Sequence, residues 1–489
     1  YQEELDGMIE AEKRREAEER QRRQPPKKRR RKYKKIPLYT RNDEGNLVPL
    51  RPNNSTWHAL YVDPVITPKF RKRFRLRFRL PYEEYKLLLT EVKTDDRYFK
   101  RWNGKDAVGT QASPLELLLL GGLRYLGRGW TLDDLEESTG IDRETHRQFL
   151  HAFIDYGSTP LYRKHVTIPA EDALENNSFE YSVAGFHGAI GSMDGTHVIQ
   201  WCVSFKQQNM HLGWKDKHTT RTYNLTCNHR RRILCTTKGH PGTYNDKMLV
   251  RFDEVITAVK RGELYQDNIF ELYEQSVDGT VNKVKYRGVW FLCDNGYLNW
   301  GITIPPFKNS TDYREIRFSE WLESMRKDVE CCFGIMKGRW RCLKTGIRLH
   351  GVDAGDKIWL TCCALHNRLL EVDGLDNKWE QGVPSDWQSK MGEHEQADAP
   401  LAIQRLNAPS LIRNYDTTEQ HGSADVVLPP EDSQLVVNDP SADGTGAIPV
   451  RNLSMKCFRQ KLVEHFDICF QKKELHWPTR LKNFTPRNI

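Results

Sequence analysis

The order of apolar segments between residues 182 and 372 is the strongest constraint on the fold. Four segments have the length and residue types of β-strands: 184–203, 221–230, 232–240 and 289–297. Two segments have a helical period: 245–264, which Asn245 is expected to cap, and 319–340. The short turn NHRRR joins the second strand to the third as a hairpin. Three antiparallel strands, a helix, a further strand and a closing helix predict a mixed α/β domain.

An acidic residue interrupts the first of these strands. In GAIGSMDGTHVIQW (residues 188–201), Asp194 follows Ile190 and Ser192 on one side of a pattern of period two. A carboxylate in an apolar strand is costly unless its charge is compensated. Asp194 is therefore either a metal ligand or a turn residue beside Gly195.

Two further acids lie at the ends or edges of apolar elements. Asp294 ends the strand VWFLC, at the position where open α/β sheets place their sites. Glu330 borders the apolar stripe of helix 319–340, with Gly334 and Gly338 further along the same ridge. Taken singly, the two aspartates are typical of turns and the glutamate of a solvated helix face.

Three carboxylates in one place would repel each other, and divalent cations would remove that conflict. Oxygen-only ligands suit Mg²⁺ or Mn²⁺ rather than zinc. Two such ions would favour attack on a phosphodiester bond, because they stabilise both the attacking and the leaving oxygen. The acids therefore predict phosphodiester chemistry.

The net charge of +9 is concentrated in two basic runs. Residues 22–35 carry ten Lys and Arg residues without an acid, and residues 69–79 carry seven. The rest of the chain is therefore net acidic, and double-stranded DNA is the expected partner of the basic runs. The first run is typical of a disordered tail, a nuclear-import signal or a DNA-binding arm.

The second basic run alternates between apolar and basic residues. This alternation predicts a strand-like ribbon with one arginine face. The face is either solvated or turned toward DNA, and its arginines are Arg71, Arg73, Arg75, Arg77 and Arg79.

A helical region is predicted from Pro81 to about Tyr156. One helix is expected to start with Ser113 as its cap and Pro114 in its first position. Further on, Thr131 and Asp142 are expected to cap two short helices joined through Gly140, as in a helix-turn-helix. The alternative is an ordinary helical hairpin. In the DNA-binding case Arg143, Thr145, His146 and Arg147 would lie early in the recognition helix.

The pattern divides the chain into five parts. They are a basic, disordered tail and linker (1–65), a basic ribbon with a helical, helix-turn-helix-like DNA-binding domain (66–165), the α/β domain (180–372), a mostly disordered linker (373–450) and a C-terminal helical segment (451–489). No apolar run is long enough to predict a membrane span. The eleven cysteines are expected to be reduced thiols of an intracellular protein.

Five stretches in order resemble the PIF/Harbinger superfamily of DDE transposases and transposase-derived nucleases, in its plant-type branch. They are GSMDGTHV, PGTYND, CDNGY, RKDVECCFGIMKGRW and CCALHN, and the resemblance covers about residues 66–372. It implies a ribonuclease-H-like catalytic domain that needs Mg²⁺ or Mn²⁺, with Asp194, Asp294 and Glu330 as the three catalytic acids.

The resemblance also implies roles for residues around these acids. Asp246 matches a further acid near the metal site, and His197 matches the histidine of the DGTH motif, either close to the site or packed in the core. Lys337 and Arg339 are either phosphate contacts or solvated charges. Members of the superfamily often act with a separate Myb/SANT-like DNA-binding protein.

The expected activity is that of a nuclear, homo-oligomeric transposase. It would cut DNA at transposon ends and join the freed 3′-hydroxyl to target DNA. The alternatives are a domesticated, non-catalytic DNA-binding or regulatory protein, and a nuclease without strand transfer.

Overall fold

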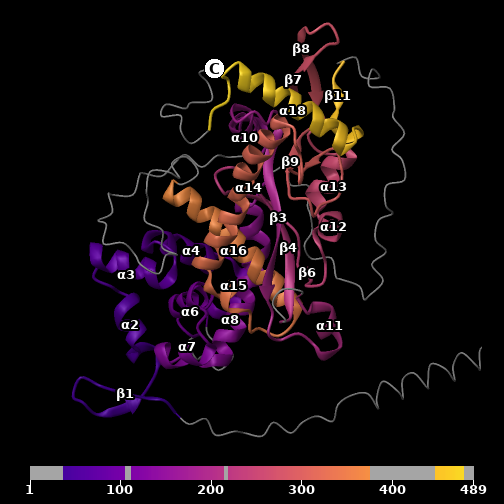
Figure 1. Ribbon diagram of the computed structural model, residues 1–489. Helices are drawn as coiled ribbons and strands as arrows, with labels where there is room; N and C mark the ends of the chain where they lie inside the picture. Colours follow the sequence, from indigo (N-terminus) through magenta and orange to yellow (C-terminus); the bar gives the residue numbers. More distant parts are fainter. Residues whose placement is uncertain (1–36, 105–111, 214–217, 375–445, 478–489) are drawn as a thin grey trace, which may run out of the picture. The chain divides into compact units, whose positions relative to one another are not determined.

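A computed structural model describes residues 37–104, 112–213, 218–374 and 446–477 (Figure 1). The chain forms two compact units, which divide between Leu50 and Arg51. In the first unit, β1 (Tyr39–Arg41) and β2 (Leu47–Pro49) pair antiparallel. Their connecting turn is closed by a hydrogen bond from Asn46 N to Asn42 Oδ1, at 2.8 Å. The tail 1–36 and most of the predicted linker 373–450 lie outside the described residues.

The second unit starts with a helical region. Its helices are α2 (Thr56–Tyr61), α3 (Pro68–Phe78), α4 (Tyr82–Thr94), α5 (Asp96–Phe99), α6 (Leu115–Arg128), α7 (Leu132–Thr139), α8 (Arg143–Tyr156), α9 (Tyr162–His165) and α10 (Glu171–Val183). A π-helical segment (Gly157–Leu161) joins α8 to α9. The prediction of a linker up to residue 65 was wrong, because α2 buries Trp57 and Tyr61 in the helical core.

The predicted basic ribbon was also wrong, because residues 68–78 form helix α3. Thr67 caps the helix by accepting a hydrogen bond from Phe70 N at 3.1 Å, and Pro68 takes its first position. Phe70, Phe74 and Phe78 are four residues apart, so they share one helical face and pack together. The sequence of this segment fits the period of a strand as well as that of a helix, and burial of the aromatic face selects the helix.

The two helices predicted from Thr131 onward are confirmed as α7 and α8. Thr131 accepts a hydrogen bond from Asp134 N, and Asp142 accepts one from Glu144 N. Gly140 ends α7 with a left-handed backbone, at φ 65°. The predicted start of α6 was one residue early, since Pro114 rather than Ser113 occupies its cap position.

A mixed sheet forms the centre of the α/β region, in the strand order β10–β9–β3–β4–β5. Its strands are β3 (Ala189–Ile199), β4 (Thr220–Cys227), β5 (Ile233–Thr236), β9 (Trp290–Leu292) and β10 (Thr303–Ile304), and β6 (His240–Pro241) pairs with β4. The first three strands are antiparallel as predicted, whereas β9 and β10 run parallel to β3.

Helices flank this sheet on both sides (Figure 1). On one side lie α14 (Tyr313–Arg339), α15 (Arg341–Thr345) and α16 (Val352–Asp373), and on the other α12 (Asp246–Leu249) and α13 (Glu254–Arg261). The short helix α11 (Gln208–His211) lies in the β3–β4 connection. Asn245 caps α12 as predicted, but Asp253 caps a separate helix α13, so the single helix expected over 245–264 is interrupted. Helix α14 begins six residues before its predicted start at Ser319.

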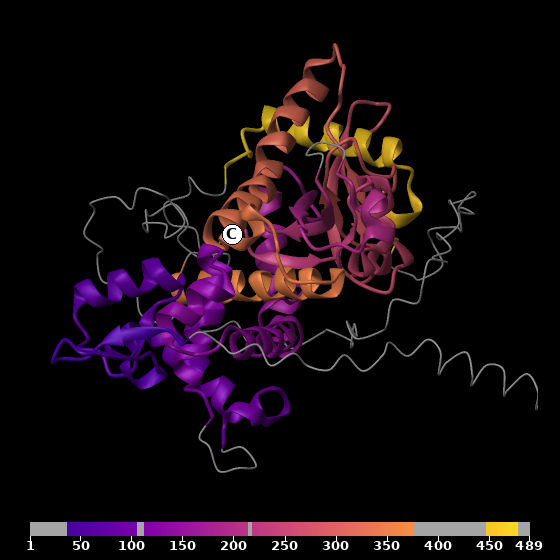
Figure 2. The same cartoon turned by 90° about the horizontal axis from the view of Figure 1, so that it is seen from below.

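A second sheet and the C-terminal helix complete the unit. Strands β7 (Ile269–Gln275) and β8 (Val281–Arg287) form a hairpin, and β11 (Ile448–Pro449) adds in parallel to β8. The predicted C-terminal helix is α18 (Met455–Gln471), which packs against β7 and α14. Figure 2 shows α18 and the N-terminal helices on opposite sides of the sheet.

One hydrophobic core joins the helical region to the sheet. It runs from Trp57 and Phe74, through α6 and α8, to Leu225 of β4 and Trp359 of α16. A second core packs α18 and the β7–β8 hairpin against α14 and β9. None of the helices in the described part of the chain is long and apolar enough to cross a membrane.

Candidate functional site

The strand register brings Asp194 and Asp294 to the same level of the sheet. Ser192 of β3 pairs with Leu292 of the parallel strand β9. Asp194, within β3, and Asp294, just after β9, each lie two residues further along, so the two acids are at the same level and on the same side of the pleat. Each is fixed by a local backbone donor at 2.7 Å: Gly195 N for Asp194 and Gly296 N for Asp294.

The side chain of Asp246, in the first turn of α12, lies close to Gly195 and Asp294. A Cβ atom added to Gly195 would lie 2.6 Å from Asp246 Oδ1. One added to Gly296 would lie 2.6 Å from Asp246 Oδ2 and 2.9 Å from Asp294 Oδ1. The two glycines therefore leave the space in which these carboxylates converge, which explains the DG and DNG sequences in which the aspartates occur.

Glu330 is connected to Asp194 through Arg326, one turn earlier on α14. Arg326 Nη2 donates to Glu330 Oε1 at 2.9 Å, and Nη1 donates to Asp194 Oδ2 at 3.2 Å. The same guanidinium also pairs with Glu323 at 3.2 Å. The Arg326 side chain is only 12% exposed, so this network of charges is partly shielded from water.

The environment of Asp194 makes its carboxyl easier to protonate than that of a free aspartate. Burial raises the pKa of its carboxyl to about 6, and the nearby charges of Asp294 and Asp246 add to this rise. The Gly195 N–H and Arg326 oppose it by stabilising the carboxylate. Asp194 thus feels the charges of the two other aspartates, and Arg326 is its counter-ion.

The donor chemistry of the cluster suits a hard divalent cation, because every group that would bind it is a carboxylate oxygen. Arg326 bridges Asp194 and Glu330, so its guanidinium pairs with oxygens that a cation would bind. No set of three or more His, Cys, Asp or Glu side chains within the described ranges is arranged to hold a metal ion.

His197 lies on the other side of β3 from Asp194. Its Nδ1 lies 3.2 Å from Thr220 Oγ1 and 3.1 Å from Thr222 Oγ1, both on β4. Of the two predicted possibilities, the structure therefore favours packing against β4 over a position beside the acids.

Lys337 and Arg339, the predicted phosphate contacts on α14, are engaged inside the protein. Lys337 Nζ donates to Thr196 Oγ1 at 2.8 Å and to the carbonyl of His197 at 2.9 Å. It thereby holds the Glu330 helix against the strand that carries Asp194. Arg339 is fully buried, at 0% exposure, so its side chain is not presented to a phosphate on the surface.

The arginines predicted to form one DNA-facing surface are spread around α3. Arg71 and Arg73 are exposed, and Arg71 pairs with Glu83. Arg75 instead pairs with Asp373 of α16, and Arg77 donates to the Tyr61 hydroxyl. The last two therefore hold α3 in place.

The two arginines predicted in the recognition helix lie at the start of α8. Arg143 and Arg147 are exposed, and both also face acidic neighbours, Asp133 and Glu144. His146, between them, is buried and lies 2.8 Å from Thr139 Oγ1. It therefore belongs to the packing between α7 and α8.

Sequence reasoning missed Arg326, the residue that connects the acids. The available signal was its spacing, because an arginine four residues before Glu330 on a helix faces the same side. That spacing is common on solvated helices and gives no indication that a strand carboxylate lies opposite.

The comparison with known families matches this part of the chain. Residues 193–367, from β3 to α16, match the model of a family described as DDE superfamily endonuclease. The matched range contains all four acids and supports a DDE transposase-like nuclease. No curated protein and no solved structure matches the chain.

Proposed function

We propose that this chain is a metal-dependent DNA endonuclease of the transposase type. The observation that carries the proposal is the convergence of Asp194, Asp246 and Asp294, with Glu330 joined to Asp194 through Arg326. These acids fall within the range that matches the DDE endonuclease model.

The four carboxylates would hold the catalytic cations, two Mg²⁺ or Mn²⁺ ions. Bound there, such ions supply positive charge that stabilises the attacking and leaving oxygens of a phosphodiester. The chain's own part is to position its carboxylates. Gly195 N and Gly296 N orient two of them, and Lys337 fixes the helix of Glu330 against β3.

The finer proposal is a PIF/Harbinger-type transposase with a ribonuclease-H-like domain. The strand order β10–β9–β3–β4–β5, with three antiparallel strands followed by two parallel ones, supports this fold. We propose double-stranded DNA at transposon ends and at the target as the substrate, a homo-oligomer as the active form and the nucleus as the location. A Myb/SANT-like partner would add sequence recognition.

Nicking of a supercoiled plasmid by the full chain tests the activity. We expect nicking with Mg²⁺ or Mn²⁺, none after chelation, and none from Asp294→Asn under the same conditions. Asp267→Asn is the matched control, because Asp267 is exposed and lies outside the acid cluster. Undiminished nicking by the Asp294→Asn variant would contradict the proposal, and an assay for joined products separates transposition from simple cleavage.

A domesticated, non-catalytic DNA-binding protein is the second candidate. The observation in its favour is Arg326, whose ion pairs satisfy Asp194 and Glu330 without any cation. A wild-type chain that binds DNA but never nicks it, with either metal, would decide for this candidate.

A further inference from the structure

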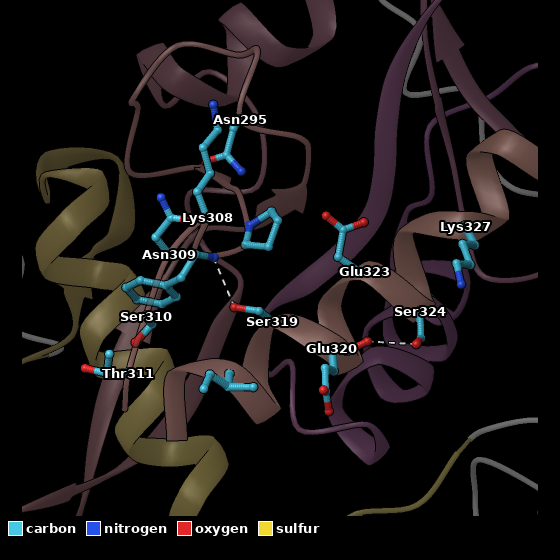
Figure 3. Close-up of a pocket in the computed structure, with 13 residues that line it drawn as sticks. Asn295, Lys308, Asn309, Ser310, Thr311, Ser319, Glu320, Glu323, Ser324 and Lys327 are labelled. Atoms are coloured by element: carbon cyan, nitrogen blue, oxygen red, sulfur yellow. Dashed lines mark hydrogen bonds between the residues drawn. The ribbon is translucent and has the colours of Figure 1, made fainter. Parts of the chain in front are cut away.

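A cleft of about 930 Å³ lies along the first half of α14 (Figure 3). One wall is the loop that follows β10, with Lys308, Asn309 and Thr311, and Asn295 joins it. The other wall is helical, and Glu323 and Lys327 lie on it. The helical wall belongs to α14, the helix that also carries Arg326 and Glu330.

The cleft and the acid cluster are neighbours. Asn295 directly follows Asp294 in the chain, and Glu323 shares Arg326 with Asp194 and Glu330. A group bound in the cleft would therefore lie beside the carboxylates.

The loop wall is held in place by several bonds. Phe307 N donates to Ser319 Oγ at 3.0 Å, and Ser310 Oγ donates to Glu315 Oε2 at 2.6 Å. Arg459 of α18 lies 3.7 Å from the centre of the Phe307 ring and donates to the carbonyls of Pro305 and Pro306. The cleft is thus a preformed site, as most small-ligand sites are.

The lining offers neutral hydrogen-bonding groups rather than an excess of positive charge. In the part of the chain that the structure describes, no hydrogen bond or ion pair engages the side chains of Asn295, Asn309 or Thr311. The charges of the lining cancel, since it holds two lysines and two glutamates: Lys308, Lys327, Glu320 and Glu323. Asparagine amides both donate and accept, which matches the edge of a nucleobase better than it matches a phosphate.

The size of the cleft indicates whether it would hold duplex or single-stranded DNA. Its volume is at the upper end of the range for small-molecule pockets, and a B-DNA duplex, whose major groove alone is about 12 Å wide, does not fit inside such a pocket. One or two nucleotides of a single strand do.

We propose that this cleft binds one or two unpaired nucleotides of the DNA strand next to the phosphodiester held by the acids. The inference rests on the proposed function and extends it, because it assigns a subsite for DNA beyond the cleaved bond. The asparagine and threonine side chains would bind base edges, and the lysines at the walls would face the strand's phosphates.

Fluorescence anisotropy of the full chain without metal tests the proposal. The probes are a short labelled duplex with blunt ends and the same duplex with a single-stranded extension of a few nucleotides. We expect the extension to tighten binding about tenfold, since several base contacts are added. The Asn309→Ala/Thr311→Ala variant should lose most of this gain and keep its affinity for the blunt duplex.

The control is Asn209→Ala, because Asn209 is exposed on α11, outside the cleft. Equal wild-type affinity for the two probes, or a gain that the double variant keeps, would overturn the inference while leaving the nuclease proposal intact. Full displacement of the gain by free deoxynucleotides would overturn it in favour of a mononucleotide site. Failure to bind either duplex would overturn the proposed function and this inference together.

Discussion

Arg326 and a divalent cation compete for the same carboxylates, and this competition gives the sharpest test of the site. Asp194 and Glu330 both accept hydrogen bonds from the Arg326 guanidinium. A cation that binds these oxygens must break both ion pairs. Arg326→Gln removes the charge and keeps a side chain that donates hydrogen bonds. We therefore expect the variant to bind Mn²⁺ more tightly than the wild type.

The expected size of the effect follows from the exposure of the two pairs. The pair with Asp194 is shielded, with side chains 12% and 20% exposed, and contributes about 1–2 kcal/mol. Glu330 is 51% exposed, so its pair contributes only about 0.5 kcal/mol. The total of about 2 kcal/mol corresponds to a Kd for Mn²⁺ that is lower by about 30-fold.

Isothermal titration of the full chain with Mn²⁺ measures this directly, without any need for activity. Arg314→Gln is the matched control, because it makes the same change on the same helix at an exposed position paired with Asp312. Unchanged or weaker Mn²⁺ binding by the Arg326 variant would refute the idea that the guanidinium stands in for a cation.

Two further predictions concern packing and pH. Gly195→Ala should lower both Mn²⁺ affinity and nicking, because the new Cβ would lie 2.6 Å from Asp246 Oδ1. Gly334→Ala should leave both intact, because its new Cβ would meet nothing within 4 Å. Equal loss in the two variants would contradict this reasoning. Burial alone would raise the pKa of Glu91, but Arg368 and Lys164 outweigh it and hold that pKa at about 2. Because its pKa lies below the unfolded value, Glu91 stabilises the fold above about pH 4.5 and loses that effect as the pH falls toward 2. In urea unfolding, Glu91→Gln should therefore cost about 1–2 kcal/mol at about pH 7, after allowance for solvent screening, and less than half of that at about pH 3; a cost independent of pH would argue against this role.

The sequence predicted the strands of the sheet and the caps of helices α7 and α8 because those features depend on local patterns. The strands around Asp194 and Asp294 are apolar runs with clear ends, and the caps Thr131 and Asp142 act on residues two or three positions away. The pairing of these two strands, which puts Asp194 and Asp294 at equivalent levels, came only from the structure.

The predictions were wrong where packing against distant parts of the chain determines the local structure. The alternation in residues 69–79 fits a strand as well as a helix, and only the aromatic core around Phe74 selects the helix. Arg75 and Arg339 were expected to contact DNA or to be solvated, because only their charges are visible in the sequence. Arg75 instead pairs with Asp373 of α16, far away in the chain, and Arg339 is fully buried.

The position of α18 has a consequence for how the protein is made. Tyr273 N of β7 donates to His465 Nδ1 of α18, which is 192 residues further along the chain. At ribosomal speeds of about 5–20 residues per second, that helix emerges about 10–40 s after the hairpin it completes. Once α14 has emerged, its Phe318 and Trp321 lack Phe466, the ring that packs against both, until α18 follows. The nascent chain thus carries all four acids while one side of their supporting helix still exposes apolar surface, the state in which chains depend most on chaperones.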